Sequence, residues 1–453
     1  MSDLKIETEQ LVYRKDLALD LFEKIQQYPY AMLLRSASDN HPNNRYDILV
    51  HSPIITVETY GGISNVTTNR ERSQVTEDPF ELLRSLQQQY LPHSHTDTHL
   101  PFIGGWLGYF AYDLGRRIEA FKNIAEHDLN APDMAVGLYE KALVIDHELK
   151  QAYWVGQNLN SENMPERNHQ QVEIQHPSFQ LESPWSANMT KAQYQSKFET
   201  VQDYLLAGDC YQINLAQRFS ADYSGSEWKA YKILENENKA PFSAFLRLPH
   251  NAVISVSPER FLLAHDKKVE TKPIKGTRPR FNDPLKDKQQ RDDLQTAEKD
   301  QAENLMIVDL LRNDIGRVSA PGSVKVPHLF EIESFPAVHH LVSTITGVLD
   351  EQYDEYDLLR ACFPGGSITG APKVRAMQII EELEPHRRSV YCGSIGYISR
   401  CGNMDTSITI RTLITEDHKI HAWAGGGLVA DSECESEYQE TLHKLGKILP
   451  VLE

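Results

Sequence analysis

The chain has 453 residues, of which 40% are hydrophobic and 24% are charged, as is ordinary for a globular protein. Its formal net charge of −18 argues against nucleic acid or an anionic membrane as a partner, because both are negatively charged. No uncharged apolar run approaches the roughly 18 residues of a membrane span, and the start of the chain does not read as a signal peptide. Five dispersed cysteines without a CxxC pair indicate reduced thiols and a cytoplasmic protein.

The first third of the chain predicts strands and one helix. Residues 45–59 and 142–156 are rich in β-branched and aromatic side chains, which favours strands. Residues 78–91, DPFELLRSLQQQYL, predict a helix that begins at Asp78. Residues 157–187 are polar and contain three prolines, which is typical of a connection. We therefore divide the chain into an N-terminal region, 1–156, a connection, 157–187, and a C-terminal region, 188–453.

The C-terminal region mixes helices and strands. Tyr194, Phe198, Val201 and Leu205 keep helical spacing in a segment that Gly208 and Asp209 end. Further strands are predicted at residues 252–264, 393–400, 403–415 and 419–430. Because these elements do not alternate in a regular βαβ order, the sequence predicts an α+β fold with antiparallel sheet.

Two acidic helices are candidates for a metal site. On a helical wheel, Glu303 falls inside an apolar sector of residues 297–314, so it is either paired with a cation such as Arg312 or bound to a metal. In residues 434–449, one stripe is apolar (Tyr438, Leu442, Leu445 and Leu449) and another carries Glu437, Glu440 and Lys444. Such a charged stripe is usually solvated, but three glycines at 425–427 would let a backbone approach a ligand. One glutamate from each helix would suit Mg²⁺, which takes one or two carboxylates.

Two loops hold further candidates. FPGGSITGAPKVRAMQII, residues 363–380, lacks the Lys-Ser/Thr of a phosphate loop, but its free amides could hold a small carboxylate, and Pro372 suits a first helical turn. In TKPIKGTRPR, residues 271–280, Lys275 stands between an apolar elbow and Gly276. Taken alone, Lys275 reads as a surface lysine.

Seven motifs in order resemble the chorismate-utilising enzymes: PIKGTRPR, DQAENLMIVDLLRNDIGRV, HHLVSTITG, FPGGSITGAPKVRAM, GSIGYIS, SITIRT and AGGGLVADSECESEYQET. The resemblance covers nearly the whole chain and implies a two-sheet α/β sandwich of largely antiparallel strands, with helices outside and the active site in the cleft. It implies Mg²⁺ on Glu303 and Glu440, with Asp300 and Glu437 as acids behind them. It also implies that chorismate contacts His340, Ser367, Tyr391, Arg411, Gly427 and Lys444.

Within this family, the chain is most similar to the branch that makes 4-amino-4-deoxychorismate for 4-aminobenzoate and folate synthesis. The resemblance implies that Lys275 attacks C2 of chorismate while Glu259 protonates the leaving 4-hydroxyl, and that ammonia then adds at C4 and expels the lysine. Anthranilate-forming members typically carry alanine at 275, and water-adding members carry lysine at Gln212. A glutamine amidotransferase would be a separate subunit, forming a heterodimer, because no cysteine here lies in a Gly-x-Cys-x-Gly setting.

A second resemblance is to the tryptophan pocket of the family, and it maps onto Ser36, Asn43, Asn44, Arg45, Tyr46, Pro241, Phe242 and Ser243. Anthranilate-forming members usually carry glutamate at Arg35, so the resemblance favours a structural over a regulatory tryptophan; an ordinary strand and turn is the other interpretation. Two alternative functions remain at this point: the first component of an anthranilate synthase, and a non-catalytic tryptophan-binding subunit.

Overall fold

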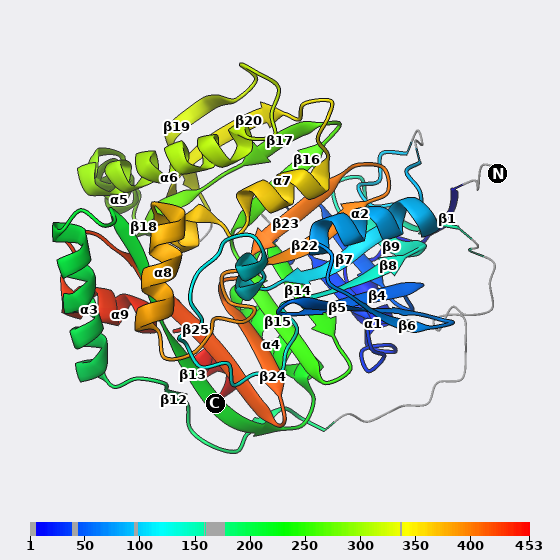
Figure 1. The fold of residues 1–453 in the computed structure, drawn as a ribbon, viewed down its shortest axis with the longest axis horizontal. Coiled ribbons are helices and arrows are strands. Elements are labelled where there is room, and N and C mark those ends of the chain that lie inside the picture. Colours follow the sequence, from blue (N-terminus) through cyan, green and yellow to red (C-terminus); the bar gives the residue numbers. More distant parts are fainter. Residues whose placement is uncertain (1–5, 39–43, 95–97, 158, 160–176, 336–337) are drawn as a thin grey trace.

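The structure is a computed structural model that describes residues 6–453 except 39–43, 95–97, 158, 160–176 and 336–337. Within the described residues, two large sheets lie at the centre of the molecule and helices lie around them (Figure 1). Neighbouring strands in both sheets run antiparallel. The predicted α+β fold with two antiparallel sheets is therefore confirmed.

The first sheet has 13 strands. In spatial order they are β1 (Glu7–Leu11), β10 (Gln151–Gly156), β9 (Lys141–Asp146), β3 (Tyr46–Val50), β2 (Met32–Arg35), β14 (Phe242–Arg247), β15 (Asn251–Ser257), β24 (Thr412–Glu416), β25 (Lys419–Leu428), β13 (Gln212–Ser224) and β11 (Gln180–Leu181), with β12 (Ser186–Ala187) and β21 (Gly370–Ala371) also paired to β13.

The second sheet has 12 strands. In spatial order they are β18 (Ile274–Pro279), β20 (Val338–Val348), β17 (Lys268–Thr271), β16 (Arg260–His265), β23 (Met404–Ile408), β22 (Ser394–Ser399), β7 (Gly105–Phe110), β8 (Met134–Tyr139), β4 (Ile55–Tyr60), β5 (Ile63–Thr68) and β6 (Arg72–Val75), with β19 (Lys325–Ser334) also paired to β20.

The helices pack around the sheets. They are α1 (Leu17–Phe22), α2 (Pro79–Tyr90), α3 (Lys191–Leu206), α4 (Glu227–Asn238), α5 (Pro284–Thr296), α6 (Glu298–Gly316), α7 (Glu355–Cys362), α8 (Lys373–Leu383), α9 (Cys434–Lys444) and α10 (Leu449–Leu452), with short 3₁₀ turns η1 (Tyr112–Arg117) and η3 (Gly366–Ile368). Helices α1, α4 and α10 share a core cluster with the first sheet, and a larger cluster joins both sheets to α6 and α7. Among the described residues, no helix is both long and apolar enough to cross a membrane.

Both sheets combine strands from the two ends of the chain. Strand β2 pairs with β14 in the first sheet, and β7 pairs with β22 in the second. Most of the predicted connection, residues 158 and 160–176, lies outside the described residues, and its last part forms β11 and β12 against β13. The division into three regions stays a prediction.

The start of the helix predicted at Asp78 agrees with the structure, while two other predicted helix boundaries differ. The Asp78 carboxylate accepts hydrogen bonds from the N–H groups of Phe80 and Glu81, so it caps α2 as predicted. The predicted continuous helix over 434–449 is wrong: α9 ends at Lys444, and the chain turns at Gly446 before α10. Pro372 precedes the first residue of α8 instead of lying in its first turn.

A buried ion pair joins three helices next to the glycine loop at 365–370. The Lys373 ammonium donates to Asp314 Oδ2 at 2.5 Å and to the carbonyl of Cys362 at 3.1 Å, which connects α8 to α6 and α7. Asp314 is fully buried and Lys373 is nearly so. Loss of one partner would leave the other charge in a nonpolar environment, which costs much more than loss of an exposed pair.

We therefore expect Lys373→Ala to lower the free energy of unfolding by about 3–5 kcal/mol. The double variant Lys373→Met/Asp314→Leu should lose less, because it leaves no unpaired charge. Urea unfolding followed by circular dichroism measures both effects. Lys191→Ala, which breaks an exposed pair with Glu435, is the matched control and should leave the urea midpoint unchanged. Equal midpoints for Lys373→Ala and Lys191→Ala would contradict this account.

Candidate active site

A cavity of about 1240 Å³ contains every residue predicted for chorismate chemistry. Its walls come from the first sheet, the second sheet, α6, α9 and the η3 turn. The predicted residues that line it are Glu259, Lys275, Asp300, Glu303, His340, Ser367, Tyr391, Arg411, Gly427, Glu437, Glu440 and Lys444. Tertiary structure thus brings together side chains that are spread over 186 positions of sequence, from 259 to 444.

Lys275 lies on strand β18, and a β-bulge directly follows it. Lys275 is opposite Leu341 and Thr277 is opposite His340, so the register shifts at Gly276. Gly276 has a φ of +75°, and a Cβ there would lie 2.8 Å from Leu294 Cδ1 and 2.9 Å from Asp300 Cγ. Such bulges re-aim side chains next to active sites. The interpretation of Lys275 as an exposed surface lysine is therefore wrong, because it is half-buried in a strand and lines the cavity.

Burial moves the pKa values of Lys275 and Glu259 toward each other. Burial raises the pKa of the Glu259 carboxyl to about 7, while Lys275 and the N–H of Ile274 oppose the shift. Burial also lowers the pKa of the Lys275 amine, against the attraction of Glu303. Protonated Glu259 can donate a proton and neutral Lys275 can attack an electron-poor carbon, so the pair can serve acid and nucleophilic chemistry in one cavity.

The acids of α6 and α9 meet at one side of the cavity. A Cβ on Gly426 would lie 3.0 Å from Glu437 Oε2 and 3.8 Å from Glu440 Oε1, so the glycine leaves room for both carboxylates. Ser432 Oγ donates to Glu437 at 2.6 Å, and burial raises the pKa of Glu437. Burial also raises the pKa of Glu303, and Lys275 opposes this shift. Among the described residues, no group of three or more His, Cys, Asp or Glu side chains could hold a metal by itself.

These acids have nearby cations that the structure identifies. Arg312 pairs with Asp309 at 2.9 Å, so the predicted alternative of a Glu303–Arg312 pair is wrong. Asp300 accepts a hydrogen bond from Arg278 at 3.1 Å, which connects α6 to β18. Lys444 donates to Glu440 at 2.7 Å and to the carbonyl of Gly425 at 2.9 Å. Although burial acts in the other direction, Lys444 lowers the pKa of Glu440.

The remaining predicted substrate contacts surround these groups. Arg411 adopts φ of +51° between β23 and β24, and burial lowers its pKa. His340 bonds to Thr277 Oγ1 through Nδ1 at 2.9 Å, and burial, followed by Arg411, lowers its pKa to about 4. A neutral imidazole at pH 7 can accept a hydrogen bond as well as donate one. Ser367 lies in the η3 turn.

The structure adds cavity residues that the sequence interpretation missed. Trp423 lines the cavity and stacks on Tyr391, with ring centroids 6.3 Å apart. Strand alternation would have placed Trp423 on the same face as Gly425 and Gly427. Lys299 and Thr277 also line the cavity, and nothing in their local sequence distinguishes them from exposed residues.

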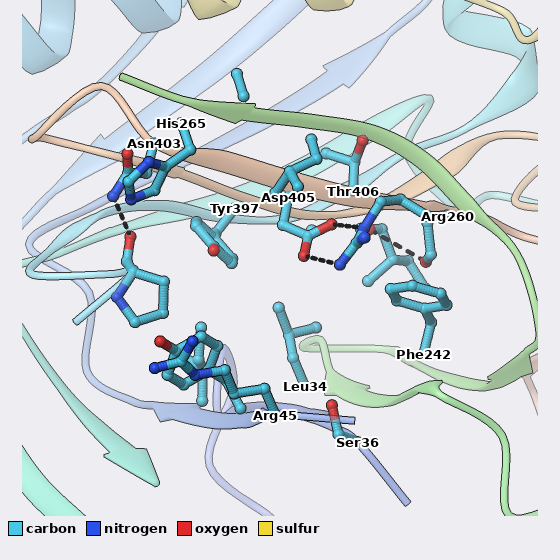
Figure 2. A pocket seen from close by; sticks show the side chains of 18 of the residues that line it. Leu34, Ser36, Arg45, Phe242, Arg260, His265, Tyr397, Asn403, Asp405 and Thr406 are labelled. Carbon is cyan, nitrogen blue, oxygen red and sulfur yellow. Dashed lines mark hydrogen bonds and ion pairs between the residues drawn. The ribbon is translucent and has the colours of Figure 1, made fainter. Parts of the chain in front are cut away.

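A second cavity of about 750 Å³ contains most of the residues predicted for tryptophan (Figure 2). Ser36, Arg45, Tyr46, Pro241, Phe242 and Ser243 line it. Asn43 lies outside the described residues, and Asn44 is not part of the lining that the structure describes. Across the cavity, Arg260 donates to Asp405 through Nε at 2.9 Å and through Nη2 at 3.0 Å, and Phe242 lies under its guanidinium.

Arg35 has a structural role beside this second cavity. Its buried guanidinium donates to Asp47 at 2.8 Å and to Asp16 at 3.1 Å, and it also bonds to Glu235. Asp47 also accepts a hydrogen bond from the N–H of Ser36 at 2.9 Å. These acids offset the positive charge of the buried Arg35 side chain.

Comparisons with known proteins identify the family to which the chain belongs. The family described as chorismate binding enzyme matches residues 36–450. Aminodeoxychorismate synthase component 1 of Escherichia coli (strain K12) is 54% identical over 444 residues, which cover 98% of each chain. Anthranilate synthase component 1 of Aquifex aeolicus (strain VF5) is 34% identical over 470 residues, covering 98% of this chain and 94% of that one.

The fold agrees as well. The crystal structure of anthranilate synthase component I from Streptococcus pneumoniae TIGR4 superposes with a TM-score of 0.78 at 33% identity, covering 91% of this chain and 93% of that chain. A family match along most of the sequence, relatives that align over nearly the full length and a shared two-sheet fold all point the same way. The chain belongs to the chorismate-binding enzyme family.

Proposed function

We propose that this protein converts chorismate and ammonia to 4-amino-4-deoxychorismate, a precursor of 4-aminobenzoate and folate. The observation that carries the proposal is the joint placement of Lys275 and Glu259 in one cavity, with pKa shifts that favour a neutral amine and a protonated acid. The high identity to an aminodeoxychorismate synthase component 1 supports the same assignment.

The proposed reaction uses Lys275 as a covalent nucleophile in an amino transfer. Its amine bonds to C2 of chorismate, the two ring double bonds shift, and the C4–O bond breaks as Glu259 gives its proton to the leaving hydroxyl, which departs as water. Ammonia then bonds to C4, the double bonds shift back, and the C2–N bond breaks with its electron pair returning to Lys275. The new C4 ammonium returns a proton to Glu259, so both residues are regenerated.

We further propose that Glu303 and Glu440 hold Mg²⁺, with Asp300 and Glu437 behind them. The donors here are carboxylate oxygens, which suit this hard cation, and two carboxylates leave room for substrate oxygens. The bound ion would offset the negative charge of a substrate carboxylate. Arg411 and Lys444 supply protein cations for the same dianion.

Two binding partners complete the proposal. The relatives are named component 1, which supports a second subunit, and we propose that a glutamine amidotransferase supplies ammonia as that subunit. We also propose that L-tryptophan occupies the second cavity, where apolar and aromatic walls surround the Arg260–Asp405 pair (Figure 2).

The purified protein, incubated with chorismate, Mg²⁺ and ammonium, should form 4-amino-4-deoxychorismate, detected by chromatography with mass detection. Lys275→Ala should nearly abolish this product, because the covalent route is lost. Lys272→Ala, which removes a neighbouring lysine paired with Glu333, is the matched control and should keep wild-type turnover. Wild-type turnover by Lys275→Ala would disprove the covalent route, and anthranilate as product would move the protein to the anthranilate branch.

The role of Glu259 predicts a pH dependence. Because the reaction needs Glu259 protonated and Lys275 neutral, kcat/KM for chorismate should be bell-shaped in pH, and its descending limb requires the ionisation of Glu259. The free ammonia concentration must be held constant, since ammonia itself titrates. Glu259→Gln should lower kcat/KM by roughly 10²–10⁴-fold and remove this descending limb. If the descending limb of the pH profile persisted in Glu259→Gln, a group other than Glu259 would be responsible for it.

Isothermal titration calorimetry tests the second cavity. L-tryptophan should bind one site per chain, and Ser36→Phe should abolish the heat, because the larger ring fills the cavity that Ser36 lines. Lys275→Ala, in the other cavity, should bind tryptophan as the wild type does. Undiminished binding to Ser36→Phe would place tryptophan elsewhere.

A further inference from the structure

Asn214 on β13 is a buried polar residue of the large cavity to which the mechanism above assigns no part. It lies opposite Gly427 in the pairing of β13 with β25, and a Cβ on Gly425 would lie 2.7 Å from its side-chain oxygen Oδ1. Strand alternation puts its side chain on the face that carries Gly425 and Gly427. Asn214 lines the cavity and is only 8% exposed.

The backbone of Asn214 is held firmly, so the side chain has a defined place. Its N–H donates to the carbonyl of Thr369 at 2.9 Å, and its carbonyl accepts from Arg388 at 2.7 Å. Arg388 also donates to the carbonyl of Ile368 at 2.9 Å, next to Ser367 in the η3 turn. The same arginine thus fixes Asn214 relative to a predicted substrate contact.

The side-chain oxygen of Asn214 lacks a hydrogen-bond donor. Within the described part of the chain, Oδ1 is buried and has no hydrogen-bond partner. A buried acceptor without a donor costs free energy, so such groups usually meet a donor in some state of the protein. The position on the cavity wall indicates that this donor arrives with a ligand.

The chemistry of chorismate identifies the donor, an argument that rests on the proposed function. Its two carboxylates and its ether oxygen only accept hydrogen bonds, and its 4-hydroxyl is its single donor. Lys444 already donates to Glu440 and Gly425, and Lys275 is assigned to C2. We propose that Asn214 Oδ1 accepts a hydrogen bond from the substituent at C4, which is the hydroxyl of the substrate and the amino group of the product.

A binding cycle between Asn214 and the 4-hydroxyl tests this assignment. All proteins in this experiment carry Lys275→Ala, so that neither ligand reacts. The two ligands are chorismate and 4-deoxychorismate, which lacks the 4-hydroxyl. Their binding is measured by quenching of tryptophan fluorescence, because Trp423 lines the cavity. Chorismate should bind about tenfold more tightly than 4-deoxychorismate when Asn214 is present. The isosteric change Asn214→Leu should reduce this preference to less than about twofold.

The matched control is Gln87→Leu on α2. Gln87 is also 8% exposed with an unpartnered buried oxygen in the described structure, but it lies outside the cavity lining. This variant should keep the tenfold preference, and Asn214→Leu should unfold at the same temperature as its parent or higher, because an unpaired acceptor is removed.

Three outcomes would overturn the proposal: a preference that survives Asn214→Leu, an equal loss of affinity for both ligands, or a loss of preference that Gln87→Leu reproduces. If chorismate binds to none of the proteins, the proposed function itself fails. If it binds but shows no coupling to Asn214, only the present assignment fails.

Discussion

Burial of charge between the two sheets is the constraint on which the active site depends. Lys275 and Glu259 would both be ionised in water at neutral pH, and only removal from water favours their neutral forms. The structure achieves this on both groups: burial is the largest influence on each pKa, and the charges nearby only moderate it. A more open cavity would leave both pKa values closer to those of the free side chains.

Packing around the cavity makes this burial possible. Strand β18 packs closely against α5 and α6 at the Gly276 bulge. A side chain at position 276 would collide with Leu294 and Asp300 and would force the strand away from these helices. Gly426 leaves space for two carboxylates of α9, and a Cβ on Gly427 would overlap the amide of Gln212. Neither Gly426 nor Gly427 has a positive φ, so they are required there for space and not for backbone conformation.

The two cavities differ in the residues that line them, but they share one residue of their walls. Pro241 lines both of them, directly before β14. The large cavity contains the acids of α6 and α9, whereas the second contains the bidentate Arg260–Asp405 pair with the ring of Phe242 beside it. Because β14 pairs with β2 from the N-terminal part, the second cavity exists only when both ends of the chain have folded together.

Local pattern in the sequence determined much of this protein. Alternation and β-branched residues identified strands such as β15 and β25, the cap at Asp78 identified the start of α2, and the helical wheel placed Glu303 toward the interior. The family motifs predicted residues that the structure places along the wall of one cavity. These features depend on neighbours close in the chain, which sequence shows directly.

Only tertiary structure decided which distant groups meet. Arg312 lies nine residues after Glu303, about 13.5 Å along the axis of α6, and pairs with Asp309 in its own turn. Lys444 of α9, by contrast, donates to the carbonyl of Gly425 on β25. The end of α9, the partners of Arg35 and the unpaired oxygen of Asn214 likewise appear only when the strands pair. Hydrogen bonding and desolvation act over a few ångströms in space, and those distances are set by packing between segments that lie far apart in sequence.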